Sequence, residues 1–273
     1  MSDAIRVGLI GYGYASKTFH APLISGTPGM ALSAVVSSDA QKVLADWPAT
    51  QVVASANSLF ADPDIDLIVI PTPNDTHFPL ARAALEAGKH VIVDKPFTVT
   101  LSQARELDAI ARSRGRLLSV FHNRRWDSDF LTLKALIAAG ELGEVSYFES
   151  HFDRYRPQIR DRWRELGGPG SGIWYDLGPH LLDQAVNLFG LPVSIAVDLA
   201  QQRPGAQATD YFHAVLIYPQ RRVILHSTLL AAAETARYIV HGSRGSYVKY
   251  GLDPQEERLK SGERLPQEDW GYD

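Results

Sequence analysis

The residues VGLIGYGYASKTFHAP, positions 7–22, join a short apolar run to a segment with a helical pattern through a glycine turn. Gly11 permits a tight turn after a strand, and Gly13, which has no Cβ, lets backbone N–H groups approach a pyrophosphate. Ser16 stands where the usual fingerprint has a third glycine, and it is small enough for close helix packing. By itself the motif fits an ordinary strand-to-helix turn equally well, so its surroundings have to decide.

The first 120 residues alternate between apolar runs and helical patterns. Strands are expected at residues 5–10, 31–36, 65–73, 90–93 and 116–122, and helices at 16–25, 40–47, 77–88 and 102–115. Such regular alternation predicts an α/β fold with a doubly wound parallel sheet, the Rossmann arrangement. In this setting the glycine turn is interpreted as a dinucleotide-binding turn.

After about Asn123 the pattern changes to longer strands with period-two alternation. A helix at 129–140 precedes expected strands at 144–153, 193–201, 211–219, 222–231, 237–242 and 246–251, with a helix-bearing segment at 168–190. We predict an NAD(P)-binding Rossmann domain at 1–122 and an α+β domain at 123–273, with an open, mostly antiparallel sheet, for substrate binding and oligomerisation. Apolar side chains on its open face favour a homodimer or higher homo-oligomer.

Composition narrows the function classes. The chain has 273 residues, a formal net charge of −4 and no cysteine. This balance gives no general attraction to nucleic acid, and the lack of cysteine excludes disulfides and thiolate metal sites. The N-terminal apolar run is too short for a signal peptide, and no segment reaches the length of a membrane helix. We therefore expect a cytoplasmic protein with neither a nucleic acid nor a membrane partner.

The end of the second strand bears on the choice of cofactor. Ser37 and Ser38 occupy the place where NAD-binding sites usually carry an acid for the ribose hydroxyls. Two hydroxyls with Lys42 nearby favour NADP. Asp39 follows directly and no arginine is adjacent, so NAD stays open, as does an ordinary loop.

Two further strand ends carry polar residues. Asp94 and Lys95 follow the strand at 90–93, and PTPNDTH, residues 71–77, follows the strand before it. Ligands bind outside the carboxyl ends of parallel strands, so both segments are candidates for a cofactor cleft. An ordinary surface lysine and a simple helix cap are the alternative interpretations.

The segment YDLGPHLLDQ contains Asp176, His180 and Asp183, which share one face if the segment is helical. A solvated charged face, a His/carboxylate metal site and a catalytic acid/base pair are all consistent with this spacing. The metal interpretation is the weakest, because no further histidine lies at ligand spacing.

The motifs GYGYAS, VDKP and DLGPHLLD together resemble the glucose-fructose oxidoreductase / inositol dehydrogenase family (Gfo/Idh/MocA) over essentially the whole chain. The stretches SVFHNRRWDSDFLTLK, FDRYRP and DYFH are similar to its NADP-dependent scyllo-inositol dehydrogenase branch. The resemblance implies a catalytic group of Lys95, Asp176 and His180, and a Trp163–Arg164 pair that reaches the cofactor. DKP replaces the commoner EKP, so Asp94 has a shorter reach toward the cofactor ribose. The family pattern continues past residue 273, so we expect the second domain to be incomplete at its C-terminus.

The resulting expectation is an NADP-dependent oxidoreductase that moves a hydride between nicotinamide and a secondary alcohol or ketone of a polyol, inositol or sugar. His180 takes the hydroxyl proton, Asp176 orients it and Lys95 stabilises charge on oxygen. A non-catalytic dinucleotide sensor and a carbonyl reductase are the alternatives, and no metal is expected. Expected cofactor contacts are Gly11, Tyr12, Gly13, Tyr14, Ala15, Ser37, Ser38, Thr72, Asn74, His77, Asp94, Lys95, Trp163 and Arg164. Expected substrate contacts are Asn123, Arg124, Trp126, Asp127, Asp153, Tyr155, Trp163 and His180.

Overall fold

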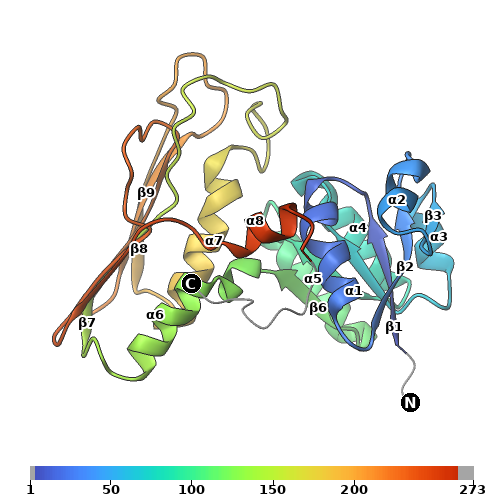
Figure 1. The fold of residues 1–273 in the computed structure, drawn as a ribbon, viewed down its shortest axis with the longest axis horizontal. Helices are drawn as coiled ribbons and strands as arrows, with labels where there is room; N and C mark the ends of the chain where they lie inside the picture. Colours follow the sequence, from blue (N-terminus) through green and yellow to red (C-terminus); the bar gives the residue numbers. More distant parts are fainter. Residues whose placement is uncertain (1–3, 264–273) are drawn as a thin grey trace. The chain divides into compact units, whose positions relative to one another are not determined.

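The computed structural model describes residues 4–263 and contains two compact units (Figure 1). The first unit comprises residues 4–121 and 254–263, and the second comprises residues 122–253. Each unit has a sheet of its own.

The first unit has a parallel sheet with the strand order β3-β2-β1-β4-β5-β6. Its strands are β1 (Ile5–Ile10), β2 (Met30–Val36), β3 (Gln51–Val53), β4 (Leu67–Ile70), β5 (His90–Asp94) and β6 (Leu118–Phe121). All four residues of β4 are buried, as expected for a central strand that is covered on both faces. The order reverses between β1 and β4, which is the switch point where Rossmann folds bind ligands. The predicted doubly wound parallel sheet is confirmed.

The connecting helices are η1 (Ser16–His20), α1 (Ala21–Gly26), α2 (Ala40–Asp46), α3 (Ala56–Ala61), α4 (Asn74–Glu86) and α5 (Leu101–Arg114). Thr100 and Gln103 form a capping box at the start of α5, and Gly115 ends it in the left-handed conformation. The sequence did not reveal β3 or α3, which are too short to show a clear period. Helix α4 begins three residues before the predicted His77, because its first turn is polar and lacks apolar periodicity.

Helix α8 (Gln255–Lys260) lies in the described part of the C-terminal segment. Residues 254–263, which the sequence predicts to belong to the second domain, group with the first unit by their contacts, and the domain boundary stays a prediction. Tyr14 provides the reason: its hydroxyl donates to Glu256 Oε1 at 2.6 Å, and Lys260 Nζ lies 5.9 Å from the centre of its ring. Such long-range contacts cannot be read from local sequence patterns.

The second unit has a sheet with the order β12-β11-β7-β10-β9-β8. Its strands are β7 (Val145–His151), β8 (Ser194–Ala200), β9 (Tyr211–Ile217), β10 (Arg222–Thr228), β11 (Tyr238–Gly242) and β12 (Ser246–Lys249). The β7–β10 pair is parallel, and the other pairs are antiparallel. The predicted mostly antiparallel sheet is thus confirmed.

Helices α6 (Ser128–Ala138) and α7 (Gly172–Phe189) cover one face of this sheet, and the short helix η2 (Asn123–Trp126) precedes α6. Phe148 of β7, Phe212 of β9 and Leu225 of β10 pack with Leu133 and Leu181 in the core between helices and sheet. In the described part of the chain no helix covers the other face (Figure 1), which we call the open face.

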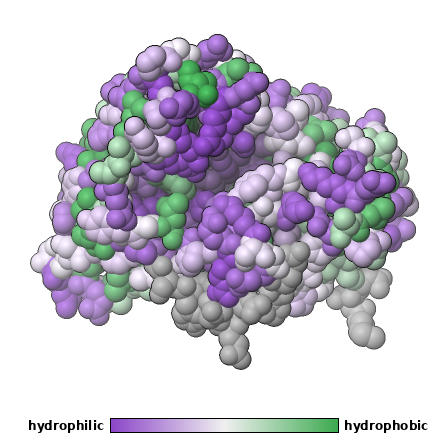
Figure 2. All heavy atoms as spheres, turned by 45° about the horizontal axis from the view of Figure 1, so that its top comes forward, coloured by the Kyte–Doolittle hydropathy of each residue, from purple (hydrophilic) through white to green (hydrophobic). Residues whose placement is uncertain are grey.

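The surface is of mixed character. The side visible in Figure 2 carries small hydrophobic patches among hydrophilic residues, as is typical of a surface in contact with water. Within residues 4–263, no helix combines the length and the apolar character that crossing a bilayer requires.

Candidate active site

The glycine turn after β1 has the backbone that the sequence predicts. Gly11 has a φ of +89°, in the region that favours glycine, and its N–H donates to the Val36 carbonyl at 2.9 Å. A Cβ added to Gly13 would have no neighbouring atom within 4 Å, so open space lies before this residue. Ser16 is buried and donates to the Gly11 carbonyl at 2.8 Å, and thus fixes the turn as well as fitting the helix. The turn fits a dinucleotide pyrophosphate.

Tyr12 and Tyr14 of the turn differ in exposure. The Tyr12 side chain is buried and its hydroxyl donates to Asp46 at 2.8 Å, whereas Tyr14 is exposed and contacts α8. Ala15 has helical backbone angles and continues directly into η1. Lys42 donates to the Tyr12 carbonyl at 3.2 Å, so a cation of α2 stands beside the turn.

After the end of β2, Asp39 is the N-cap residue of α2. Its carboxylate accepts from the Lys42 N–H at 3.1 Å and caps α2. Ser37 makes reciprocal bonds with the Asp39 backbone, at 3.0 and 3.1 Å, and Ser38 is exposed. Asp39 is therefore used as a helix cap, and both Ser38 and Asp39 are exposed.

His77 joins the segments that follow β4 and β5. It is fully buried, with Nδ1 2.8 Å from the Pro96 carbonyl oxygen and Nε2 2.8 Å from the Thr72 carbonyl oxygen. Both ring nitrogens are thus occupied by backbone carbonyls, and a contact of His77 with the cofactor stays a prediction. Asn74 is also buried, and the Thr72 methyl lies 3.8 Å from the point where a Cβ of Gly11 would stand. Of this segment, Thr72 is thus the residue that adjoins the glycine turn.

The Asp94 carboxylate contacts two partners in the first unit. His20 Nε2 lies 3.3 Å from Asp94 Oδ2, and the Lys95 N–H donates to Oδ1 at 2.6 Å. Burial raises the pKa of Asp94, but the bond and charge of His20 and the charge of Lys95 outweigh it and hold the pKa below its usual value. Lys95, partly exposed, directly follows β5. His20 was not among the residues predicted from the sequence, because it lies 74 positions from Asp94.

In the second unit, α7 carries the predicted constellation. Asp176 and His180 lie one turn apart on it, and His180 is 5% exposed. Asp183 binds Arg125 through two hydrogen bonds, of 2.7 and 2.6 Å, and lies 3.8 Å from His122. Asp183 therefore belongs to a separate ion pair, and Asp176 and His180 are the two members of the predicted group left on this face of α7.

Arg164 is a neighbour of Asp176 that the motif pattern did not indicate. Its guanidinium lies 3.5 Å from the Asp176 carboxylate and 4.6 Å from the centre of the Trp163 ring. The Gly172 N–H donates to the Arg164 carbonyl at 2.8 Å, which ties this loop to the start of α7. The Trp163–Arg164 pair is thus fixed beside the predicted catalytic carboxylate.

Three of the predicted substrate residues are exposed: Trp126 to 69%, Tyr155 to 60% and Trp163 to 36%. Asn123 lies with Trp126 in η2 and is partly exposed.

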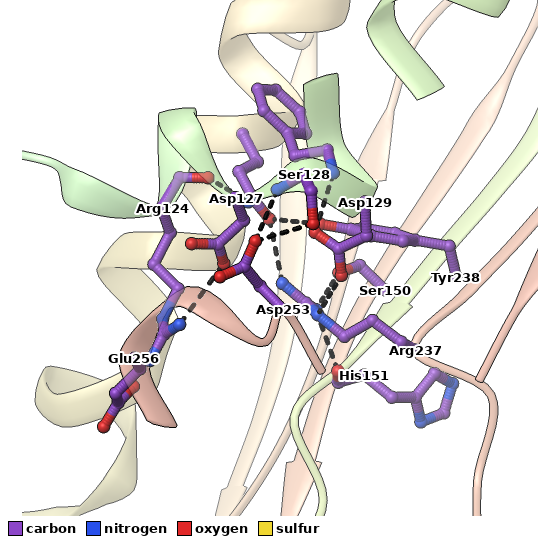
Figure 3. Close-up of polar contacts among 12 residues, drawn as sticks. Arg124, Asp127, Ser128, Asp129, Ser150, His151, Arg237, Tyr238, Asp253 and Glu256 are labelled. Atoms are coloured by element: carbon purple, nitrogen blue, oxygen red, sulfur yellow. Dashed lines mark hydrogen bonds and ion pairs between the residues drawn. The ribbon is translucent and has the colours of Figure 1, made fainter. Parts of the chain in front are cut away.

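Asp127 instead belongs to a buried polar network (Figure 3), which corrects the expectation that it binds substrate hydroxyls. The Arg124 guanidinium lies 3.3 Å from the Asp127 carboxylate, so this arginine also forms an ion pair within the protein. Burial raises the pKa of Asp127 to about 7; Arg124 opposes this shift, while Asp129 and Asp253 add to it. Asp253 accepts from the N–H and the hydroxyl of Ser128, at 2.6 and 2.7 Å.

Asp153 follows β7 and lies on the same side of the strand as His151, because alternate residues of a strand point to opposite sides. Its expected contact with the substrate stays a prediction. Its carboxylate accepts from the Thr228 N–H and contacts His151 Nδ1, both at 3.0 Å.

Comparison with known proteins supplies the wider context. Residues 5–122 match the model described as "Oxidoreductase family, NAD-binding Rossmann fold", and residues 134–273 match "Oxidoreductase family, C-terminal alpha/beta domain", both of the GFO_IDH_MocA type. The oxidoreductase YdgJ of Escherichia coli (strain K12), named as uncharacterized, is 82% identical over 273 residues, which are 100% of this chain and 79% of that protein.

A second curated protein and a solved structure also match essentially the whole chain. The scyllo-inositol 2-dehydrogenase (NADP(+)) IolW of Bacillus subtilis (strain 168) is 39% identical over 271 residues, covering 99% of this chain and 76% of that protein. The structure of YPO2259 of Yersinia pestis, named as an oxidoreductase, superposes with a TM-score of 0.94 at 73% identity, covering 100% of this chain and 77% of that one.

Proposed function

This chain belongs to the Gfo/Idh/MocA family of oxidoreductases, and we propose that it transfers a hydride between NADP and a secondary alcohol or ketone of a polyol, inositol or sugar. The observation that carries the proposal is the buried His180, one helical turn from Asp176. Such a pair is suited to moving a hydroxyl proton.

Cofactor binding is proposed at the glycine turn. The open space before Gly13 and the fixed Gly11 carbonyl support a pyrophosphate at this position. The use of the Asp39 carboxylate as a helix cap, with Ser38 exposed before it, supports NADP over NAD. The NADP(+) dependence in the name of IolW agrees with this choice.

The bound nicotinamide supplies or accepts the hydride. In the oxidation, His180 takes the hydroxyl proton as the carbonyl forms, and in the reduction it returns that proton. Asp176, held by Arg164 at 3.5 Å, orients His180 and favours its charged form. The Lys95 ammonium stabilises the negative charge that develops on the substrate oxygen. Together these roles describe a metal-independent alcohol–ketone interconversion.

The substrate class follows from the accessible polar and aromatic residues. Trp126 and Tyr155 offer flat surfaces for the apolar faces of a sugar or cyclitol, and Asn123 offers donors and acceptors for hydroxyls. Trp163 is a further stacking candidate, and its neighbour Arg164 is a candidate cofactor contact. A polyhydroxylated ring is the ligand that such a set suits best.

The test is a set of turnover assays. Wild-type protein is assayed with NADP and a panel of polyols, inositols and sugars, and with NADPH and the corresponding ketones. We expect Lys95→Met and His180→Ala to lower kcat by roughly 100-fold or more, while the Kd for NADPH stays within a few-fold. The exposed Lys134 of α6 provides the matched control, Lys134→Met.

Two outcomes contradict the proposal. Tight NADPH binding without turnover of any panel member identifies a dinucleotide sensor, and undiminished kcat in both variants rejects the assigned roles. Turnover confined to ketones with NADPH identifies a carbonyl reductase.

We also propose a cytoplasmic homo-oligomer, most simply a homodimer. Val215 and Ile217 of β9 and Ile224 of β10 alternate with core residues and so lie on the open face. Sedimentation of wild-type protein and of Ile224→Glu tests the assembly, since a charge in a buried interface dissociates it. A monomeric wild type contradicts this part.

A further inference from the structure

The open face carries a cluster of histidines and carboxylates that the proposed reaction does not use. His151 of β7 and His226 of β10 are direct partners in the parallel β7–β10 pairing. Both side chains point to the open face, because Leu225 and Ser227, on either side of His226, are buried against the other face. Their ring centres are 5.0 Å apart, and Asp153 lies two residues after His151 on the same side.

The three side chains converge on one point. His151 Nδ1 lies 3.0 Å from one Asp153 oxygen, and His226 Nε2 lies 3.7 Å from the other. One ligand atom from each of the three residues can be chosen so that all lie within 4.8 Å of one another. Tetrahedral zinc holds its nitrogen and oxygen ligands roughly 3.3 Å apart. Small side-chain rotations therefore bring the three atoms to metal-binding distance.

A second layer of contacts orients His151. Its Nε2 lies 2.6 Å from Glu149 Oε1, and Glu149 Oε2 accepts from the Tyr147 hydroxyl at 2.5 Å. A ligating histidine usually donates its other ring nitrogen to a carboxylate in this way, which fixes the ring and strengthens the ligand. The His151 backbone carbonyl accepts a hydrogen bond from Arg237 of the buried network, whereas Figure 3 shows the His151 ring pointing away from that network. The imidazole ring therefore lies on the open face.

His226 is held beside Asp153 without a direct hydrogen bond. The 3.7 Å separation exceeds hydrogen-bond length. Among residues 4–263, its buried Nδ1 has no hydrogen-bond partner. His226 Nε2 is therefore the ring nitrogen that faces Asp153.

We propose that His151, Asp153 and His226 bind one divalent transition-metal ion of the zinc class, with Glu149 orienting His151 and water completing the coordination. Two imidazoles and one carboxylate suit zinc better than magnesium or calcium, which prefer oxygen ligands. A cavity of about 170 Å³, lined by His151, Asp153, Glu234 and Thr235, adjoins two of the three ligands. The ion links the ends of two neighbouring strands and so stabilises the sheet. No metal was expected from the sequence, because no further histidine lies at ligand spacing from His180, whereas His151 and His226 meet only through strand pairing.

The experiment measures Zn²⁺ binding to untagged, EDTA-dialysed protein by calorimetry, and Co²⁺ binding by visible absorption. We expect one ion per chain, a rise in Tm with Zn²⁺, and a Co²⁺ spectrum typical of four-coordinate nitrogen and oxygen ligation. His226→Ala abolishes the binding. Glu149→Gln weakens it by roughly 10- to 100-fold, because it removes the support of His151 without removing a ligand.

His241 of β11 provides the matched control, because it is an exposed histidine of the same sheet that is not a ligand and whose ring stacks on Tyr147. His241→Ala leaves the stoichiometry and Kd for Zn²⁺ unchanged. Wild-type protein that takes up no Zn²⁺, or a folded His226→Ala that binds as well as wild type, overturns the proposal. If a variant fails to fold, the Co²⁺ spectrum of the wild-type protein provides the test, and a spectrum without four-coordinate nitrogen and oxygen ligation overturns the proposal. None of these measurements depends on turnover.

Discussion

The Ser16 hydroxyl donates a 2.8 Å hydrogen bond to the carbonyl oxygen of Gly11 and so closes the glycine turn from within. Ser16 is 1% exposed, and water cannot easily replace this bond. The residue that departs from the usual three-glycine pattern therefore stabilises the backbone that the first two glycines make possible.

Ser16→Ala tests this role. The Gly11 carbonyl loses its donor, so we expect the free energy of unfolding to fall by roughly 1–3 kcal/mol and the Kd for NADPH to rise. Chemical denaturation and a fluorescence titration measure the two effects. Ser113→Ala is the control, because Ser113 also donates to a carbonyl, that of Ile110, but from an exposed position. Equal effects in both variants contradict a special role for Ser16.

The choice between NADP and NAD is tested at Ser38. In Ser38→Asp, a carboxylate at the end of β2 repels the 2′-phosphate of NADP and can accept from the ribose hydroxyls of NAD. We expect the ratio of the two Kd values to shift toward NADH by about tenfold or more. Titrations with both reduced cofactors measure it, with Ser102→Asp at the exposed start of α5 as the control. An unchanged ratio means that this strand end does not face the 2′ position.

Gly172 is required where the Arg164 loop meets α7. It has a φ of +85°, and an added Cβ would lie 2.8 Å from the Thr209 carbonyl oxygen and 2.9 Å from the Thr209 nitrogen. Both the backbone strain and this contact oppose alanine, so Gly172→Ala should lower the free energy of unfolding by roughly 2–4 kcal/mol. Because Gly172 also binds the Arg164 carbonyl, kcat should fall as well.

The control is Gly115→Ala, at a left-handed position with no atom within 4 Å of the added Cβ. This variant should lower the free energy of unfolding only by the backbone strain, about 1–2 kcal/mol. Urea denaturation compares the two variants. A Gly172→Ala variant no less stable than Gly115→Ala shows that the Thr209 backbone yields to the methyl group.

The buried network of Figure 3 predicts an unusual pH dependence. Asp127 has a pKa of about 7, above the value of 3.8 expected for an exposed carboxyl. Between these values the folded protein keeps a proton that the unfolded chain releases, so this group makes stability fall as pH rises from about 4 to 7. Asp127→Asn removes this contribution, which amounts to about 4 kcal/mol across the window.

Urea denaturation at pH 5 and pH 8 measures the effect. The stability of Asp127→Asn relative to wild type should increase between the two values. Asp108→Asn, at an exposed residue of α5 that pairs with Arg112, is the control and should show no such trend. A difference between Asp127→Asn and wild type that is independent of pH refutes the raised pKa.

Much of the fold is local enough to be predicted from the sequence. The strand β1 was predicted to the residue, because its apolar run stops at Gly11, and α5 ends at the predicted Gly115. The shared helix of Asp176 and His180 also follows from spacing alone. The short elements β3, α3 and α8 were missed, since three to six residues do not establish a period.

The sequence by itself determined the glycine turn, the alternation of strands and helices in the first unit and the acid–histidine spacing on α7, because each depends on residues within a few positions of one another. Only the tertiary structure decided that His20 supports Asp94, that Asp127 is buried among other carboxylates, and that His151 stands beside His226. These relationships depend on strand order, register and packing between distant segments. Such packing is a property of the whole fold, and no local period encodes it.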